Sequence, residues 1–301
     1  MANLTFMNNT IFDHGASNQL GQVLAMHGIR RPLLCTDKGL VNLGMVTDLV
    51  SHLGNDAALT IFDGTPENPT QMAVEEAVAA YQEAGCDGVV ALGGGASMDL
   101  AKAVALAVTH EGDLLQYTAG LGGAGKSGTV APLIAIPTTS GTGSEVSSGA
   151  VIIMNNGATL ILASRNLVPM TSICDPSLTL GLPPLLTAAT GMDAMTHCIE
   201  ALLSPQINPP AEAVACDGIE RGIREGNLVK AVKDGSDEDA RWHMMMAAAE
   251  GAMGFSKGLG SVHSMSHACG ADQALRLHHG TLNAVILPTI LDFNRDHVGD
   301  K

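Results

Sequence analysis

Aromatic residues are scarce in this chain, and positive charges are outnumbered. Trp, Tyr and Phe make up 3% of the sequence, so a core has to be built from Ala, Leu, Val, Ile and the 15 Met residues. The 15 Lys and Arg residues face 30 Asp and Glu residues, which gives a formal net charge of −15 at pH 7. That excess of negative charge argues against nucleic acid or an anionic membrane as a partner.

Paired cysteines and long apolar runs are also missing. The six Cys residues form no CxxC pair, so the sequence predicts neither a disulfide framework nor a thiolate zinc site. The most apolar segments are interrupted, VAPLIAIP by proline and AAYQEAGCDGVVAL by charge, and neither is long enough to span a bilayer. The N-terminal MANLTFMNNTIF has no basic flank before an apolar run. We therefore expect a cytoplasmic protein without a membrane partner.

The first half of the chain alternates short apolar segments with helical ones. We predict strands at 5–12 (an edge strand), 31–36, 57–62, 88–92 and 132–137, and helices at 16–27, 38–54 and 71–84. Asn155, Asn156 and Gly157 separate two further strands, 151–154 and 159–163, and indicate a hairpin. Strand and helix alternating at this spacing predict a parallel sheet covered by helices.

Two loops that follow predicted strands could bind a nucleotide. Gly93, Gly94 and Gly95 precede Ala96 and Ser97, and such a loop lets the backbone approach a pyrophosphate at the start of the next helix. Glycines also occur in such turns for steric reasons alone, and the spacing is not that of the GxGxxG fingerprint. The second loop, TTSGTGSE at 138–145, could hydrogen-bond phosphate, ribose or nicotinamide, although its composition favours a solvated turn.

The second half is helical, with a boundary predicted near 175–183, where three prolines and a glycine cluster. Asp193 and His197 lie four residues apart in an apolar segment, so both side chains project from one face of a helix. His263 and His267 repeat that spacing downstream. A buried carboxylate needs a partner or a metal, whereas a lone His in an apolar helix is more often a core residue. One Asp with three His fits iron(II) or zinc.

The histidine pair at His278 and His279 adds one more candidate ligand. Spacing alone does not decide between the two residues.

Five motifs in order resemble the iron-containing (group III) alcohol dehydrogenases: GGGASMDLAK, IPTTSGTGSEV, GMDAMTHCIEA, GFSKGLGSVHSMSHACGA and HHGTLNAVILP. The resemblance covers the chain from about residue 5 to its end. It implies a Rossmann-like α/β domain with a parallel sheet that binds NAD (1–178), and an all-α domain that binds metal and substrate (179–301). Together these make a dehydroquinate-synthase-like architecture.

The resemblance also implies roles for single residues. The metal ligands would be Asp193, His197, His263 and His279, with His267 acting beside the substrate as the catalytic residue. Cofactor contacts would come from Asp37, Asn68, Gly94, Gly95, Ala96, Ser97, Thr138, Thr139, Thr142 and Val151. A carboxylate at Asp37 would repel a 2′-phosphate, which favours NAD over NADP. Iron(II) is the expected metal, with zinc as the alternative.

The implied activity is the reversible oxidation of a small alcohol to an aldehyde or ketone by hydride transfer, in a homodimer or higher homo-oligomer. Three alternatives stay open: an enzyme like maleylacetate reductase, an enzyme like glycerol dehydrogenase or dehydroquinate synthase, and a shortened inactive chain that only binds nucleotide. The last arises because family chains usually continue well beyond the point where this one stops. Two further departures are Ala96, where members usually have Ser, and the absence of a Lys near Thr159.

Overall fold

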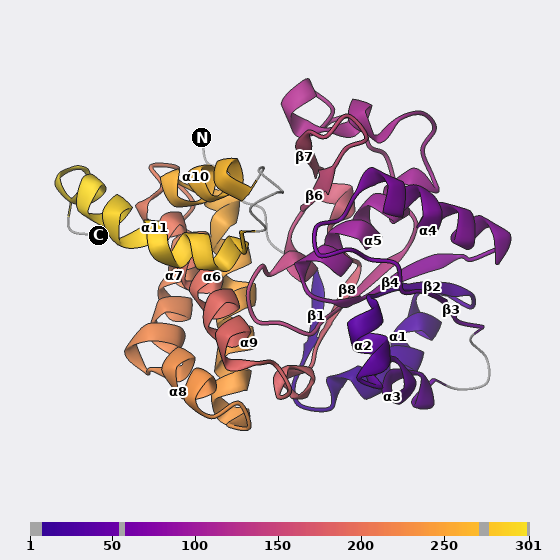
Figure 1. Ribbon diagram of the computed structural model, residues 1–301, viewed down its shortest axis with the longest axis horizontal. Helices are drawn as coiled ribbons and strands as arrows, with labels where there is room; N and C mark the ends of the chain where they lie inside the picture. The colour runs from indigo at the N-terminus through magenta and orange to yellow at the C-terminus, as the bar shows by residue number, and fades with distance from the viewer. Residues whose placement is uncertain (1–7, 54–57, 271–276, 300–301) are drawn as a thin grey trace. The chain divides into compact units, whose positions relative to one another are not determined.

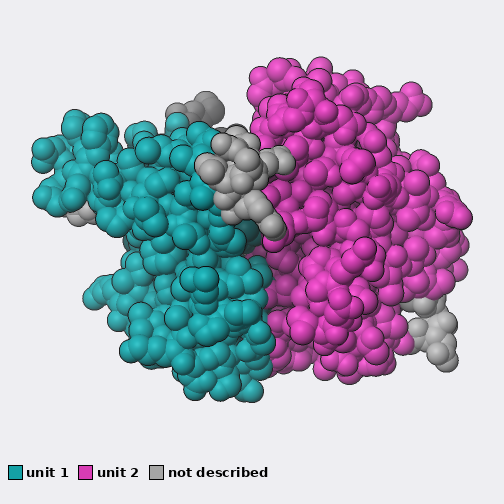
Figure 2. Space-filling model, in the orientation of Figure 1, with its two compact units in different colours: residues 1–7, 139–143, 179–301 teal, residues 8–138, 144–178 magenta. Residues whose placement is uncertain are grey.

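The structure is a computed structural model that describes residues 8–53, 58–270 and 277–299 (Figure 1). The chain divides into two compact units (Figure 2). The α/β unit comprises Asn8–Thr138 and Ser144–Leu178, and the helical unit comprises Thr139–Gly143 with Thr179–Lys301. The start of the strand predicted at 5–12, and Gly54 at the end of the predicted helix 38–54, lie outside the described residues.

The α/β unit contains a six-stranded sheet in the order β1-β8-β5-β4-β2-β3, and every paired neighbour in it is parallel. Its strands are β1 (Asn9–Phe12), β2 (Pro32–Cys35), β3 (Thr60–Phe62), β4 (Gly88–Gly93), β5 (Leu133–Pro137) and β8 (Thr171–Cys174). The predicted parallel sheet and the edge position of β1 are confirmed. Strand β8 was not predicted, because its four residues, TSIC, are too few to show a period.

Helices cover both faces of the sheet, since successive residues of each strand point to opposite sides. Leu33, Val89 and Ala91 pack with α4 (Gln71–Glu83) and α5 (Gly95–Ala107). Leu34, Val90 and Ile134 pack on the other side with α1 (Leu20–Met26) and α3 (Met45–Ser51). With both faces buried, the central strands read as continuous apolar runs rather than alternating ones.

The predicted helix 38–54 is wrong as a single element. It consists of α2 (Lys38–Asn42) and α3, and Gly44 between them has φ 81°. A residue in this left-handed conformation ends a helix, and glycine adopts it without a Cβ penalty. Asp37 is the N-cap of α2, and its side chain accepts a hydrogen bond from the Leu40 amide at 3.0 Å.

The predicted hairpin is confirmed as β6 (Gly149–Ile153) paired antiparallel with β7 (Thr159–Ala163). Gly157 in the turn has φ 83°, a conformation that suits glycine. These two strands form a separate small sheet beside the parallel one.

The helical unit is built from helices whose core side chains are small. The helices are α6 (Pro184–Leu203), α7 (Pro209–Ile219), α8 (Asn227–Lys233), α9 (Glu238–Gly254), α10 (Ser261–Gly270) and α11 (His279–Asn294). The five-residue segment Glu220–Arg224, between α7 and α8, has π-helical hydrogen bonding. The buried core among α6 to α9 consists of Ala, Met, Leu and Cys. Ala side chains let these helices approach closely without aromatic rings.

Across the described residues, no helix combines the length and apolarity that a membrane crossing requires.

Candidate metal centre and cofactor loops

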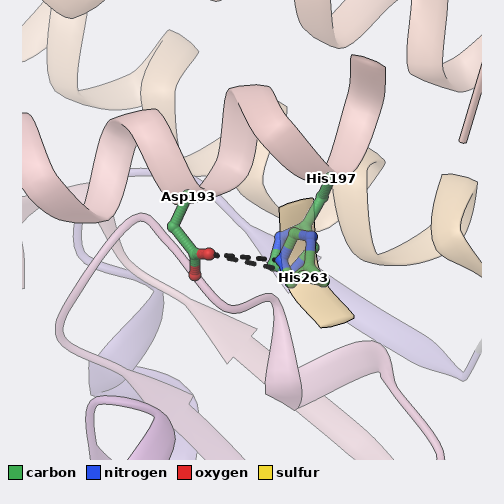
Figure 3. A group of neighbouring side chains, drawn as sticks. All are labelled: Asp193, His197 and His263. Carbon is green, nitrogen blue, oxygen red and sulfur yellow. Dashed lines mark ion pairs between the residues drawn. The ribbon is translucent and has the colours of Figure 1, made fainter. Parts of the chain in front are cut away.

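Helix α6 presents Asp193 and His197 on one face, as the four-residue spacing predicts (Figure 3). Both side chains are buried, with 3% and 5% of their surface exposed. His197 Nε2 lies 4.0 Å from Asp193 Oδ1. His197 also stacks on His263 of α10, with ring centroids 4.4 Å apart, and lies 5.0 Å from the Phe255 ring.

Two further imidazoles reach the same carboxylate oxygen from other helices. His263 Nε2 lies 3.5 Å from Asp193 Oδ1, and His279 Nε2, at the start of α11, lies 3.4 Å from it. The neighbouring His278 is exposed and precedes the helix. The structure therefore brings together the four residues predicted as ligands, and between His278 and His279 it places His279 at the centre.

The protonation states suit a cation. Burial raises the pKa of Asp193, but His197, His263 and His279 outweigh it and hold that pKa well below its usual range. Burial lowers the pKa of His197 to about 4 and also lowers that of His279. Burial alone would lower the pKa of His263, yet its hydrogen bonds with Asp193 and Glu200 raise it to about 8. At pH 7 the Asp193 carboxylate is therefore anionic and the imidazoles of His197 and His279 are neutral, which is the ligand state that divalent metals bind, whereas His263 would have to release a proton when a metal binds.

Unsatisfied polar atoms at the centre fit a metal ion. Within the described residues, Asp193, His197 and His263 offer one ligand atom each, and these atoms all lie within 4.8 Å of one another. Among the residues that the structure describes, neither His197 Nδ1 nor Asn283 Oδ1 has a hydrogen-bond partner, although both atoms are buried. Buried groups left unpaired are costly, so such a cluster indicates a missing partner.

Asn283, which the sequence analysis missed, lies at the middle of this cluster. Its Nδ2 donates to Asp193 Oδ1 at 2.6 Å and also lies 3.2 Å from His263 Nε2 and 3.3 Å from His279 Nε2. An amide carries two N–H groups, too few for three acceptors. Its position four residues after His279, on the same face of a helix, was the signal available in the sequence.

Glu200 was missed as well, although it follows His197 by three residues on the same face of α6. Its Oε2 accepts a hydrogen bond from His263 Nδ1 at 2.6 Å. The Nδ1 of His279 also has a partner away from the centre, but a neutral one: it lies 3.4 Å from the hydroxyl oxygen of Ser266. That hydroxyl donates its own hydrogen to the His263 carbonyl.

His267 lies next to the centre but outside the group that surrounds Asp193 Oδ1. Its ring centroid is 4.8 Å from that of His279 and 6.2 Å from that of His263. Desolvation and the imidazoles of His279 and His263 lower the pKa of His267 to about 4. The ring is therefore neutral at pH 7.

Close packing of α11 on α6 sets the position of His279. A Cβ at Gly280 would lie 2.1 Å from the Ala189 carbonyl oxygen of α6. We predict that Gly280→Ala pushes α11 away, lowers the free energy of unfolding by about 1–3 kcal/mol, and weakens metal binding although no ligand is changed. Calorimetry and metal titration measure the two effects.

Gly270→Ala is the matched control for this substitution, because among the described residues outside its own turn of helix a Cβ at Gly270 meets no atom within 4 Å. It should leave both quantities unchanged. Equal metal affinity in the Gly280 variant and the wild-type chain would contradict the packing argument.

In the α/β unit, most of the predicted cofactor residues gather at the carboxyl ends of β2, β4 and β5. Asp37 follows β2, Gly94 to Ser97 lead from β4 into α5, and the Thr138 amide, just after β5, donates to the Gly93 carbonyl at 3.0 Å. The chain order reverses between β2 and β4, since β3 lies on one side and β5 on the other. Ligands of open parallel sheets bind outside the carboxyl ends of strands at such a reversal.

The glycine turn requires a backbone without side chains. Gly93 has φ 149°, and a Cβ there would lie 2.4 Å from the Ser97 hydroxyl oxygen. Gly94 then precedes the first turn of α5, a 13-residue helix whose first amides point out of its N-terminus. This geometry agrees with a loop that approaches a phosphate closely.

The other predicted cofactor residues are more dispersed. Asn68 is exposed in the turn before α4, and Val151 lies in β6, where its amide donates to Asp99 Oδ2 at 2.9 Å. Thr139 and Thr142 belong to the short segment Thr139–Gly143, which packs in the helical unit. There a Cβ at Gly141 would approach Thr190 to 2.9 Å, and one at Gly143 would approach Ala252 to 2.2 Å.

Comparison with known proteins agrees with this architecture. Residues 8–176 match the family described as iron-containing alcohol dehydrogenase, and residues 187–301 match the C-terminal domain of the Fe-containing alcohol dehydrogenase family. The chain is 51% identical over 300 residues to a 4-hydroxybutyrate dehydrogenase of Cupriavidus necator, covering 98% of this chain and 78% of that protein.

Solved structures give the same assignment. The crystal structure of a 1,3-propanediol oxidoreductase superposes with a TM-score of 0.92 at 36% identity, covering 98% of this chain and 76% of the other. A sulfoacetaldehyde reductase from Bifidobacterium kashiwanohense, solved in complex with NAD+, superposes with a TM-score of 0.89 at 27% identity, covering 98% and 77%. The chain therefore belongs to the iron-containing alcohol dehydrogenase family, as its motifs indicate, and is an oxidoreductase that acts on alcohols.

Proposed function

We propose that this chain is a metal-dependent, NAD-linked dehydrogenase of a small primary alcohol. The observation that carries the proposal is the convergence of three imidazole nitrogens from α6, α10 and α11 on one buried oxygen of Asp193, at 3.4–4.0 Å. Asp193, His197, His263 and His279 would hold a divalent ion, iron(II) by family and zinc by the same ligand chemistry. When bound, such an ion supplies Lewis acidity that lowers the pKa of an alcohol hydroxyl.

The chain's own residues would balance the charge of the metal ion and take part in transfer of the proton that the alcohol releases. Asp193 supplies a negative charge that offsets a cation, and the imidazoles of His197 and His279, neutral at pH 7, keep their lone pairs available. His267, whose ring lies beside that of His279, is the proposed catalytic residue that would relay the released proton to solvent.

The α/β unit is the proposed NAD-binding domain and the helical unit the proposed metal- and substrate-binding domain. Bound NAD supplies the hydride acceptor. The turn at Gly94–Ser97 would hold the pyrophosphate through backbone amides, and Thr138, Thr139, Thr142 and Val151 would line the rest of the cofactor. Asp37 stands at the carboxyl end of β2, where a carboxylate accepts ribose hydroxyls and repels a 2′-phosphate, so we propose NAD rather than NADP.

The 51% identity to a 4-hydroxybutyrate dehydrogenase makes 4-hydroxybutyrate the first substrate to test. A homodimer in the cytoplasm completes the proposal, by analogy with the family.

The deciding experiment assays the purified full chain, stripped of metal and then reloaded with Fe2+ or Zn2+. Reduction of NAD+ and NADP+ is followed with 4-hydroxybutyrate, 1,3-propanediol and ethanol. We expect NADH to form only in the metal-loaded protein, with NAD+ preferred over NADP+. A metal-loaded, folded chain that forms no NADH from any alcohol, and oxidises no NADH with the matching aldehydes, would refute the proposed function.

A further inference from the structure

Glu200 connects the helix that carries Asp193 and His197 to the helix that carries His263. It lies on the same face of α6 as those two residues, seven positions after Asp193, and only 3% of its surface is exposed. Both of its carboxylate oxygens are used at the start of α10. Oε1 accepts from the Val262 amide at 2.7 Å, and Oε2 accepts from His263 Nδ1 at 2.6 Å and from the His263 amide at 3.3 Å.

The contact with Nδ1 determines which ring nitrogen of His263 faces the centre. When Nδ1 holds the hydrogen that it donates to a carboxylate, Nε2 keeps its lone pair. Nε2 is the atom that lies 3.5 Å from Asp193 Oδ1. A carboxylate that accepts from the remote nitrogen of a histidine both fixes the ring orientation and makes the coordinating nitrogen a stronger ligand.

The contacts with the amides determine where α10 begins. Val262 and His263 lie in the first turn of α10, where backbone N–H groups have no partner within the helix. Glu200 satisfies two of them from a different helix. The approach is close, since a Cβ at Gly260 would lie 2.7 Å from Glu200 Oε1. One side chain therefore fixes both the backbone and the ring of His263.

We propose that Glu200 is a positioning residue for the metal centre: it holds Nε2 of His263 toward Asp193 and His197 and so raises the affinity of the site for a divalent cation. The inference rests on the proposed metal-binding function. It adds a residue that touches neither the cation nor the substrate and that acts through His263.

Glutamine is the sharpest replacement for Glu200. It has the same size, but it carries an NH2 group in place of one oxygen. Because both oxygens of Glu200 accept hydrogen bonds, the NH2 group must face a donor, either the Val262 amide or the His263 Nδ1–H. The variant therefore disturbs the contacts of the carboxylate while it keeps the volume of the side chain.

The test titrates the metal-free full chain with Co2+ and follows the visible absorption bands of the bound ion. We expect Glu200→Gln to raise the Kd for Co2+ by about 10–100-fold, which is the range typical for hydrogen-bond partners of metal ligands. We also expect it to change the shape of the absorption bands. The spectrum is the informative readout, because a purely structural loss of stability would not alter it in the folded fraction.

Glu250→Gln is the matched control. Glu250 is a buried glutamate of the same unit, 6% exposed, and its ion pair is with Arg221 at 3.4 Å rather than with a histidine of the centre. We expect this variant to bind Co2+ with the wild-type Kd and spectrum.

A double-mutant cycle tests whether Glu200 acts through His263. Once His263 is replaced by alanine, Glu200→Gln should no longer change the Kd for Co2+. An equal fold-change in both backgrounds would overturn the inference. Should Glu200→Gln fail to fold, Glu200→Asp gives the decision, since it keeps the charge but withdraws the oxygens from Nδ1; a wild-type Kd and spectrum for that variant would overturn the inference too.

The outcomes separate this inference from the proposed function. A wild-type chain that binds no Co2+, Zn2+ or Fe2+ removes the proposed metal centre itself. A wild-type chain that binds Co2+, together with a Glu200→Gln variant of identical Kd and spectrum, removes only the role of Glu200.

Discussion

Replacing His279 with alanine is expected to weaken metal binding by at least about a hundredfold, because even the outer hydrogen-bond partners of ligands contribute 10–100-fold. The substitution removes an imidazole whose Nε2 lies 3.4 Å from Asp193 Oδ1. We expect kcat/KM for the alcohol to fall by about a thousandfold, since the Lewis acidity of a metal provides several kcal/mol and each 1.36 kcal/mol is a factor of ten in rate. Metal analysis after dialysis and steady-state assays measure the two effects.

The neighbouring histidine provides the control for this prediction. His278 is exposed and precedes α11, and within the described part of the chain its side chain makes no capping hydrogen bond. His278→Ala should retain the metal and the activity. If the His278 variant lost its metal while the His279 variant kept it, the assignment of the fourth ligand would be reversed.

The largest effect on stability is expected for Lys102→Met in the α/β unit. The ammonium group of Lys102 is fully buried and donates to the hydroxyl oxygens of Ser144 and Ser147, at 2.8 and 3.1 Å, and to the Gly149 carbonyl at 2.8 Å. Ser144 in turn donates to Asp99 Oδ1 at 2.8 Å. Loss of the ammonium leaves three acceptors without their donor and removes the cation near the half-buried carboxylate of Asp99, which together cost about 3–5 kcal/mol.

Unfolding of the α/β unit, followed by calorimetry, should therefore begin on the order of 10 °C lower. Lys126→Met is the matched control, because that lysine is exposed in the same unit, and its effect should stay within about 0.5 kcal/mol. Asp99→Asn combined with Lys102→Met should cost less than the sum of the single changes. Strict additivity would show that the two charges do not interact.

Burial of Lys102 also changes its pKa. Desolvation lowers its pKa to about 8, although Asp99 and Glu145 oppose the shift. The network ties α5, whose first turn follows the glycine loop, to the segment Ser144–Val151 after the threonine loop. The two loops proposed to hold the cofactor are thus linked to one helix.

The fold was predictable to the extent that its elements are long or strongly patterned. The central strands β4 and β5 are buried on both faces, so their apolar runs, GVVAL and LIAI, mark them clearly. Strand β8 is equally buried but has only four residues, two of which are polar. The break between α2 and α3 depends on one backbone angle at Gly44, and glycines inside a helical pattern do not reveal their φ.

At the candidate metal centre, sequence spacing could identify only those residues that share one face of a single helix. Asp193 and His197 form such a pair, whereas the arrival of His263 and His279 depends on how α10 and α11 pack against α6, and here the family resemblance supplied the residues. Asn283 and Glu200 carry no metal-ligand signature of their own. Their importance comes from hydrogen bonds across 90 and 63 positions of sequence, to Asp193 and to His263.

The segment Thr139–Gly143 has a practical consequence for dissecting the protein. It lies in sequence between β5 and β6 of the α/β unit, yet it packs in the helical unit, with Gly141 against Thr190 and Gly143 against Ala252. Neither unit is therefore a single stretch of chain. A helical fragment expressed from residue 179 onward would lack the contacts that this segment makes with α6 and α9, and a fragment ending at 178 would carry the segment without those contacts. Swapping whole domains between relatives by one crossover near residue 178 would likewise pair this loop with a foreign surface. To keep the described segments with their own unit, a chimera needs crossovers after residues 138, 143 and 178.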